Sequence, residues 1–295
     1  MRHIRIISPS GAIDPSLIDG AALRLLSWGY RVSVAPHARG CVGRFAAEDS
    51  GRLADFNNAL ADPGIDIILC SRGGYGLQRI IQDIRIPAGN APLLVGFSDI
   101  TAAHALLGKS GRPSLHASMC KALATLPDDL PAMQALRRAL EGCPMRYSLP
   151  PHPFQRNGEC TGRLIGGNLS VLYGLQGTSF SLRELIASCP EPPVLFLEDI
   201  GERHYHIDRM MRNLDLSGIF RHIGGLVVGQ FTDCPDDPGM GGSVLQTIAE
   251  VVHPYSFPVL FNFPAGHIDG NMPLRLHTPW HLSVTPDQNI FEELR

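Results

Sequence analysis

Three residues that can form a hydrolytic triad occur where buried strands are expected to end. "LLVGFSDIT" (93–101) runs from apolar residues into Ser98, "PPVLFLEDIGE" closes an apolar run with Glu198 and Asp199, and "FPAGHIDGN" places His267 among glycines. A serine hydroxyl becomes a nucleophile when a histidine takes its proton and a carboxylate orients that histidine. The chain order Ser98, Glu198, His267 is also that of α/β-hydrolases, but order by itself identifies no family.

Each of these residues also has a simpler structural interpretation. Ser98 or Asp99 could cap a helix that begins there, and Ile100 replaces the second glycine of the G-x-S-x-G nucleophile elbow. A carboxylate that closes a buried strand is costly unless it is paired, but Glu198 could equally lie at an exposed strand end. On the serine stretch alone a capped turn is the favoured interpretation, and a catalytic serine is the alternative.

A glycine pair follows another expected strand. In "CSRGGYG" (70–76), Gly73 and Gly74 let the backbone approach a ligand closely, with amide N–H groups free to point at it. The spacing is neither the G-x-G-x-x-G of dinucleotide-binding proteins nor a P-loop. A tight turn between strand and helix is the favoured explanation of the pair alone, so the stretch gives little support to a nucleotide site.

The overall composition excludes several classes of partner. The 295 residues carry a formal charge of −3 and a sequence pI of about 6.4, with scattered Lys and Arg, so no nucleic-acid partner is expected. No stretch approaches the ~20 consecutive apolar residues of a membrane-spanning helix. The first residues show no secretory signal. We therefore expect a cytoplasmic protein without a membrane partner.

Neither a metal nor a cofactor is expected. The seven cysteines are odd in number, widely spaced and without a CxxC pair, which argues against a disulfide framework and a zinc cluster. The stretch "HYHID" brings His204, His206 and Asp208 together, but it lacks the i, i+4 histidine pair of a helical metal site. The thiols are expected to be free in a reducing compartment.

The elements that must position these residues alternate between strands and helices in the first half. The predicted strands are "IRIISPSG", "RVSVAP", "IDIILCS" and "PLLVGFS", and the predicted helices are "SLIDGAALRLLSWGY" and "EDSGRLADFNNALADPG". Continuous apolar strands separated by helices are typical of a parallel sheet that is covered on both faces. Ligands bind beyond the carboxyl ends of such strands, where Ser98 and the glycine pair are expected.

A change in composition after residue 142 predicts a two-domain α/β protein. Residues 1–142 are predicted to form an N-terminal parallel-sheet domain of the Rossmann or flavodoxin-like, class I amidotransferase-like type. The proline-rich residues 143–160 are predicted to be a linker, and residues 161–295 a C-terminal, β-rich α/β domain. The nucleophile would then belong to one domain and the acid and base to the other, so the active site is expected between them.

Several stretches together resemble the LD-carboxypeptidase family of serine peptidases, the LdcA-like muramoyltetrapeptide carboxypeptidases. The resemblance covers almost the whole chain, with the motifs in the family's order and in both predicted domains. The stretches are "SPSG", "SRGGYG", "GFSDIT", "GRLIGGNLSVL", "LFLEDIGERHYHIDRMMRNL" and "PAGHIDGNMPLRLH".

The resemblance implies a role for each candidate residue. Ser98 would be the nucleophile, Glu198 the acid that orients the base, and His267 the base. The oxyanion hole would consist of backbone amides of Gly73 or Gly74 and of Asp99. Gly96 is then expected to let the chain turn sharply, so that the strand ends in a presented nucleophile.

The family also implies the substrate. The expected reaction is hydrolysis of the amide between the L-centre of a diamino acid and a terminal D-alanine in a cytosolic muropeptide, during peptidoglycan recycling. Arg72 is a candidate partner for the terminal carboxylate because guanidinium groups match that shape, although an ordinary ion pair is equally compatible with its position. Tyr75, His116 and Asn168 are further candidates for the cleft wall. A homodimer is implied by the family alone.

Other functions remain open. Relatives with the same fold cleave peptide-nucleotide antibiotics of the microcin C type, which requires aromatic side chains that stack on a base. The two tryptophans, Trp28 and Trp280, lie outside the recognised motifs, which favours the muropeptide. A non-catalytic module that holds a small anion at the glycine loop, and a family member whose triad never assembles, are the remaining alternatives.

Overall fold

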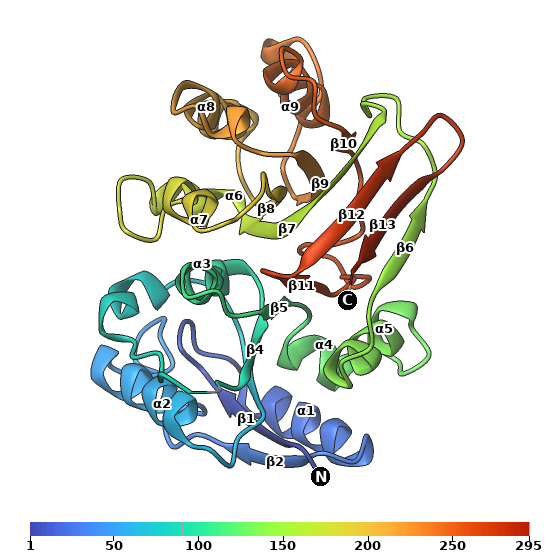
Figure 1. Cartoon of the computed structure of the whole chain (residues 1–295). Coiled ribbons are helices and arrows are strands. Elements are labelled where there is room, and N and C mark those ends of the chain that lie inside the picture. The colour runs from blue at the N-terminus through green and yellow to red at the C-terminus, as the bar shows by residue number, and fades with distance from the viewer. Residues whose placement is uncertain (90, 295) are drawn as a thin grey trace.

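The apolar runs of the first half form a largely parallel six-stranded sheet in the computed structural model, which describes residues 1–89 and 91–294. Five parallel strands stand in the order β5-β4-β3-β1-β2, and β11 joins the β5 edge in the antiparallel direction (Figure 1). The predicted parallel sheet is therefore confirmed. The strands are β1 (His3–Ile7), β2 (Arg31–Val34), β3 (Ile67–Cys70), β4 (Leu93–Gly96), β5 (Ser114–His116) and β11 (Leu274–Leu276).

Helices cover both faces of this sheet. The first of them begins at a typical N-terminal signal, because Asp14 accepts a hydrogen bond from the Ser16 amide and Pro15 occupies the first helical turn. The helices are α1 (Pro15–Ser27), α2 (Asp49–Ala61), α3 (Thr101–Lys109), α4 (Cys120–Thr125) and α5 (Pro131–Leu140), with short 3₁₀ turns η1 (Leu77–Arg79), η2 (Ile81–Asp83) and η3 (Ser98–Ile100).

The second half forms a seven-stranded mixed sheet, in the order β10-β9-β8-β7-β12-β13-β6. β7 to β10 run parallel, whereas β12, β13 and β6 run antiparallel to their neighbours. The strands are β6 (Arg146–Leu149), β7 (Gly158–Asn168), β8 (Val194–Ile200), β9 (Gly225–Thr232), β10 (Val259–Leu260), β12 (Pro279–Val284) and β13 (Asn289–Glu293). The helical segments are α6 (Leu169–Gly174), α7 (Leu182–Ala187), α8 (His204–Leu216), α9 (Val244–Val252), η4 (Ile219–Arg221) and η5 (Pro238–Met240). No helix in the described ranges is long and apolar enough to cross a membrane.

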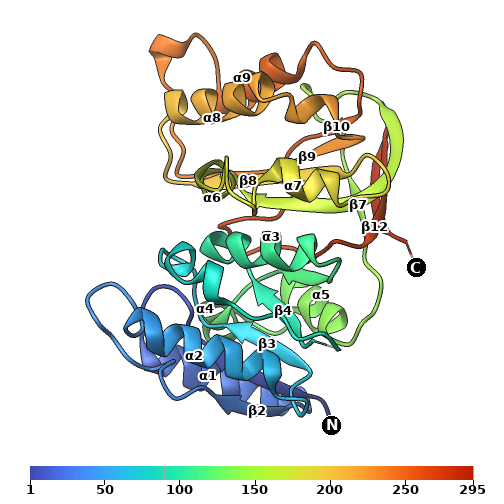
Figure 2. The same ribbon diagram turned by 60° about the vertical axis from the view of Figure 1, so that its left-hand side comes forward.

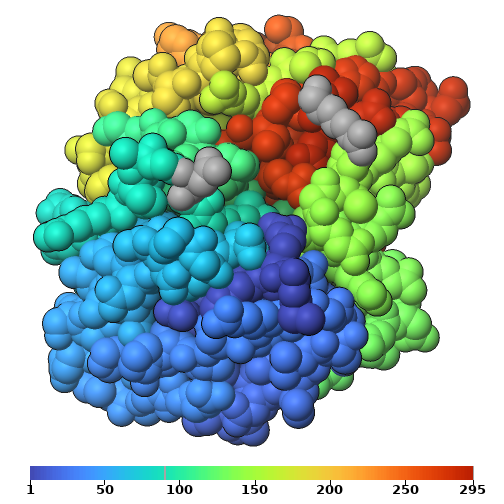
Figure 3. Space-filling model, turned by 60° about the horizontal axis from the view of Figure 1, so that its bottom comes forward, coloured from blue at the N-terminus to red at the C-terminus, as the bar shows by residue number. Residues whose placement is uncertain are grey.

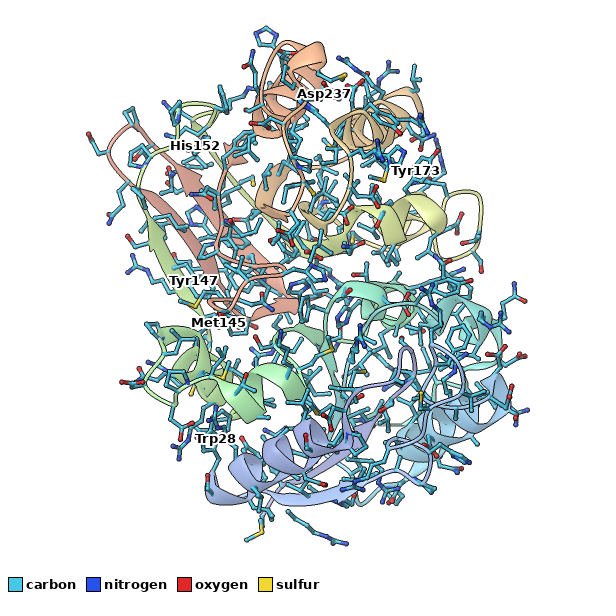
Figure 4. The ribbon with its side chains drawn as sticks, turned by 180° about the vertical axis from the view of Figure 1, so that it is seen from behind. Trp28, Met145, Tyr147, His152, Tyr173 and Asp237 are labelled. Atoms are coloured by element: carbon cyan, nitrogen blue, oxygen red, sulfur yellow. The ribbon has the colours of Figure 1, made fainter. Side chains whose placement is uncertain are left out.

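The predicted linker contains a strand of the second sheet. Residues 143–160 include β6, which pairs with β13, and the first residues of β7. The Tyr147 ring on β6 lies parallel to Trp280 at a centroid distance of 6.3 Å, and its hydroxyl donates to the carbonyl of Pro273 (Figure 4). The space-filling view shows the green surface of this segment beside the red surface of the last strands (Figure 3).

The physical reason for this difference is a short alternation between the prolines. Met145, Tyr147 and Leu149 point to the core, while Arg146 and Ser148 are exposed, which is the two-residue period of a strand with one buried face. The last part of the chain also returns to the first sheet as β11, so the two halves are interlocked. The division at residues 142 and 161 stays a prediction.

Helix α3, which directly follows the candidate nucleophile, lies against the second sheet (Figure 2). The Asn168 amide at the end of β7 donates to Thr101 Oγ1 at 3.0 Å. A Cβ on the neighbouring Gly167 would lie only 2.6 Å from that same oxygen. A glycine is therefore required here for the closest approach between the two halves.

Three buried histidines also lie where the halves meet. His104 on α3 donates from Nε2 to the Gly96 carbonyl, and its Nδ1 accepts from Ser114. The His277 ring packs on Gly108 of α3, and His116 on β5 has no solvent exposure. Burial lowers the pKa of His104 to about 4 and that of His277 to about 3, and it lowers the pKa of His116 well below the usual range.

These neutral histidines predict a loss of stability in acid. Because the unfolded chain takes up protons near pH 6.5 while folded His104 and His277 do not, the free energy of unfolding falls as pH decreases from about 6.5 toward their folded pKa values. Between pH 7.5 and pH 5 the loss is about 2 kcal/mol for each of the two. Urea unfolding of the His104→Gln protein should show a correspondingly smaller drop than the wild type. An equal drop in both proteins would contradict this assignment.

Candidate active site

Ser98 stands at the carboxyl end of β4 in a strained backbone conformation. Its φ is +65°, a value that non-glycine residues rarely adopt. The chain reverses there from β4 into η3 and then α3. This turn keeps the serine side chain at the wall of a cavity of about 640 Å³ rather than in the sheet.

Gly96 contributes to this turn in a different way from that expected. Its own φ is not positive, so the backbone strain is carried by the serine. A Cβ on Gly96 would lie 3.0 Å from Ile100 and 3.1 Å from Cys70. The glycine thus leaves room for Ile100, the residue that replaces the second elbow glycine, to fold back into the core, where it is fully buried.

Glu198 and His267 form a direct pair. His267 Nδ1 donates to Glu198 Oε2 at 2.8 Å, and the carboxylate has no solvent exposure whereas the histidine side chain is 15% exposed. Glu198 is on β8 beside Asn168 of β7, in the parallel part of the second sheet. Since Nδ1 is held by the carboxylate, Nε2 is the nitrogen left to exchange a proton with a reacting group.

The loop that presents His267 is closed by its own hydrogen bonds. Met272 N donates to the Pro264 carbonyl at 2.8 Å, and Asn271 Oδ1 accepts from the Gly266 amide at 3.0 Å. Asn271 is 1% exposed, so it is a buried support of the histidine loop. Sequence reasoning did not single it out, although a buried asparagine after "HIDG" is a residue type that often holds a loop.

Phe97 connects the serine turn with the histidine. Its ring contacts the His267 ring at a centroid distance of 4.8 Å, and the two rings line the same cavity. On its other side lies His116, which was expected in the cleft wall. His116 instead packs between Phe97 and Phe196 in the core, at centroid distances of 5.7 Å and 5.0 Å, and does not line the cavity.

The glycine pair lies directly over the serine. A Cβ on Gly73 would be 2.8 Å from the Ser98 Cβ, 3.0 Å from its Oγ and 3.1 Å from the Asp99 amide nitrogen. The Gly73 and Gly74 amides donate no hydrogen bond within residues 1–89 and 91–294. Amides without partners next to a serine oxygen can stabilise an oxyanion that forms there.

The side chain of Asp99 holds this arrangement together. One carboxylate oxygen accepts from the Ser10 hydroxyl at 2.6 Å and from the Leu77 amide at 2.9 Å. Ser10 belongs to the "SPSG" loop, and Leu77 follows the glycine loop. The aspartate therefore fixes both loops to the serine turn, while its backbone amide remains beside Gly73.

The other predicted substrate-binding residues divide into two groups. Arg72 lines the cavity with Ser98 and His267, and Tyr75 lines an adjoining one. Asn168 is 3% exposed and lines neither, so it was placed wrongly in the cleft wall. β7 ends at Asn168 and α6 begins at the next residue, so Asn168 occupies the N-cap position. Its Oδ1 accepts from the Val171 amide of α6, and its Nδ2 donates to Asp199 at 2.9 Å.

Asp199 has a structural position, unlike the neighbouring Glu198. Successive strand residues face opposite sides, so Asp199 points away from His267 and accepts hydrogen bonds from Asn168, Ser170 and the Ile200 amide. Burial, and secondarily the charge of Glu198, raise the pKa of Asp199 to about 7.

No cluster of three or more metal-ligating side chains suited to an ion occurs within the described part of the chain. His204 bonds to Thr247 and to the Asp237 amide, and His206 bonds to Glu202. The two histidines of "HYHID" therefore make hydrogen bonds to residues in and around α8.

The arrangement suits nucleophilic hydrolysis. A buried carboxylate holds a histidine, that histidine shares a cavity with a strained serine, and partnerless amides lie beside the serine oxygen. Ser98 Oγ makes no hydrogen bond to any described residue, and triads without substrate are often looser than in the reacting complex.

Known proteins share this organisation along the whole chain. Residues 4–117 match the LD-carboxypeptidase N-terminal domain, and residues 161–282 match the LD-carboxypeptidase C-terminal domain. The chain belongs to the LD-carboxypeptidase family. The motifs noted in the sequence therefore mark a family member, in both halves of the chain.

Individual relatives agree with this assignment. The murein tetrapeptide carboxypeptidase of Pseudomonas aeruginosa is 28% identical, over 90% of this chain and 88% of the relative. The crystal structure of muramoyltetrapeptide carboxypeptidase from Oxalobacter formigenes is 27% identical, with a TM-score of 0.87 over 99% of both chains. The microcin C7 self immunity protein MccF shares the fold, with a TM-score of 0.82 at 18% identity over 100% of this chain and 96% of MccF.

A single methyl group on the glycine loop tests the site of this LD-carboxypeptidase. Gly73 does not have a positive φ, so Gly73→Ala adds no backbone strain but places a methyl group against Ser98. We expect kcat/KM of the carboxypeptidase to fall by at least about 100-fold, comparable to the loss of an oxyanion donor. Because the clash with the Ser98 Cβ must be relieved by a shift of the loop or the serine, the melting temperature should also fall, and kcat/KM is compared at a temperature at which both proteins are folded.

The matched control is Gly89→Ala, where an added Cβ meets nothing within 4 Å. It should retain wild-type kcat/KM. Full activity in the Gly73→Ala protein would show that the serine oxygen does not react beneath the glycine loop.

Proposed function

We propose that this protein is a serine LD-carboxypeptidase that uses Ser98, Glu198 and His267 to release the terminal D-alanine of muropeptide tetrapeptides. The 2.8 Å contact of the fully buried Glu198 with His267, which lines the same cavity as Ser98, is the observation that carries the proposal. The murein and muramoyl peptide substrates in the names of its relatives support the choice of substrate.

In the first step His267 Nε2 takes the proton of Ser98 as its Oγ attacks the carbonyl carbon of the scissile amide. The amides of Gly73 and Asp99 stabilise the oxyanion. The C–N bond then breaks, and the protonated His267 gives its proton to the departing D-alanine amine. Glu198 accepts the Nδ1–H throughout, which fixes the tautomer and stabilises the imidazolium.

The second step regenerates the enzyme. A water molecule attacks the acyl-serine ester while His267 takes its proton, and the proton returns to Ser98 Oγ when the ester bond breaks. The products are D-alanine and a peptide that ends in the carboxylate of the L-centre. A cytoplasmic location and a homodimer are part of the proposal, in keeping with the recycling of imported muropeptides.

Neither tryptophan supports the peptide-nucleotide alternative. Trp280 has no solvent exposure and stacks on Phe291 within the second sheet. Trp28 follows α1 and is packed beside Arg137, at the far end of the first half in Figure 4. Neither lines the cavity that contains Ser98, so neither can stack on a base bound there.

The test is release of D-alanine from a tetrapeptide, followed by mass spectrometry. The wild type should release it, and Ser98→Ala should be slower by at least about 1,000-fold, as in other serine hydrolases without their nucleophile. A tetrapeptide with terminal L-alanine is the matched control substrate and should remain intact. Equal release by wild type and variant would exclude Ser98 as the nucleophile.

A further inference from the structure

A second cavity of about 420 Å³ adjoins the one that contains Ser98. The two share Ala12, Arg72 and Gly74, so they border each other at these residues. The full lining of the second cavity is Gly11, Ala12, Gly43, Arg44, Arg72, Gly74 and Tyr75. The triad chemistry described above makes no use of Arg44 or of this space.

The turn that carries Arg44 is fixed to the active-site loops. The Ala12 amide donates to the Arg44 carbonyl at 3.0 Å, and the Ala46 amide donates to the Ser10 carbonyl at 3.2 Å. Ser10 in turn donates to Asp99 beside the nucleophile. The backbone that carries Arg44 is thus connected to the serine turn by hydrogen bonds through Ser10 and Asp99.

The charge of the cavity is one-sided. Its lining includes Arg44 and Arg72 and no acidic residue, and neither arginine has an ion-pair partner among residues 1–89 and 91–294. The Arg72 guanidinium is held by one hydrogen bond among the described residues, in which Nη1 donates to the Ala12 carbonyl at 2.7 Å. By contrast, Arg52 and Arg79 nearby are both paired with Asp49.

We propose that this second cavity is an anion subsite that binds a carboxylate of the peptide substrate through Arg44 and Arg72. Guanidinium groups bind carboxylates through paired N–H donors, and two of them facing one space suit a single carboxylate or a pair. Tyr75, 44% exposed, adds an apolar wall for the carbon chain that bears the anion. The inference rests on the proposed function, because it names how that site recognises its substrate.

The carboxylate has two possible sources in such a peptide: the departing residue, or a side group on the acyl side of the scissile amide. Peptides in which one or the other carboxylate is converted to an amide distinguish them. For each pair we compare kcat/KM of the acid with that of the amide, in the wild type and in Arg44→Gln. The variant should keep the turn, because the hydrogen bond from the Ala12 amide is accepted by the backbone carbonyl of residue 44 and not by its side chain.

One of the two peptide pairs differs in the carboxylate that occupies the subsite. For that pair, we expect kcat/KM of the acid divided by kcat/KM of the amide to be about tenfold lower in Arg44→Gln than in the wild type. The change should come mainly from a higher KM for the acid. Arg44→Lys should recover part of that ratio. Arg31→Gln removes the same charge from exposed β2, at the outer edge of the first sheet, and should leave both ratios unchanged. Unchanged ratios for both peptide pairs in Arg44→Gln would overturn the subsite.

A binding experiment separates failure of the subsite from failure of the proposed function. Calorimetry measures the affinity of the Ser98→Ala protein for the intact tetrapeptide, with and without Arg44→Gln. A wild type that releases no D-alanine would refute the proposed function, while about tenfold weaker binding by the double variant would still support the subsite. Equal binding by the two proteins, or none by either, would refute the subsite.

Discussion

The active site depends on the close contact between Thr101 of α3 and the end of β7. The Asn168 amide donates to Thr101 at 3.0 Å, and Gly167 leaves no room for a side chain between them. α3 begins three residues after Ser98, and Glu198 lies beside Asn168 on the next strand. One interface therefore sets the distance between Ser98, the proposed nucleophile in one half, and Glu198 and His267, the proposed acid and base in the other.

Burial determines how the proposed acid and base, Glu198 and His267, can act. The Glu198 carboxylate is removed from water, and its Oε2 is satisfied by His267. A buried carboxylate that accepts from one ring nitrogen fixes the tautomer of the imidazole and leaves the other nitrogen toward the cavity. Burial also lowers the pKa values of His104, His116 and His277 at the junction of the halves and keeps these histidines neutral. The same junction that positions the candidate residues therefore makes the fold sensitive to acid.

Local sequence signals were sufficient for the parallel sheet and for candidates at its strand ends. Ser98, Glu198 and His267 each follow an apolar run, and a turn or glycine marks each position. Positions determined by packing between distant segments could not be read in this way. His116 is enclosed by Phe196 from the other half, and Asn168 is directed by Asp199 and the start of α6. The alternation of residues 145–149, which contains β6, is short and has a proline on each side, so the sequence resembled a linker.

The most direct test of this account is the rate at which a fluorophosphonate labels Ser98 in Gly167→Ala, compared with the wild type. The substitution leaves all three candidate residues in place but brings a Cβ to 2.6 Å from Thr101 Oγ1. Gly158→Ala, at a φ of +148° close to the +137° of Gly167 and with no atom nearer than 3.5 Å to the added Cβ, is the control for backbone strain. The account predicts rapid labelling of the wild type and the control, and labelling at least about tenfold slower in Gly167→Ala with the fold retained. Equal labelling of all three proteins, or none of the wild type, would contradict it.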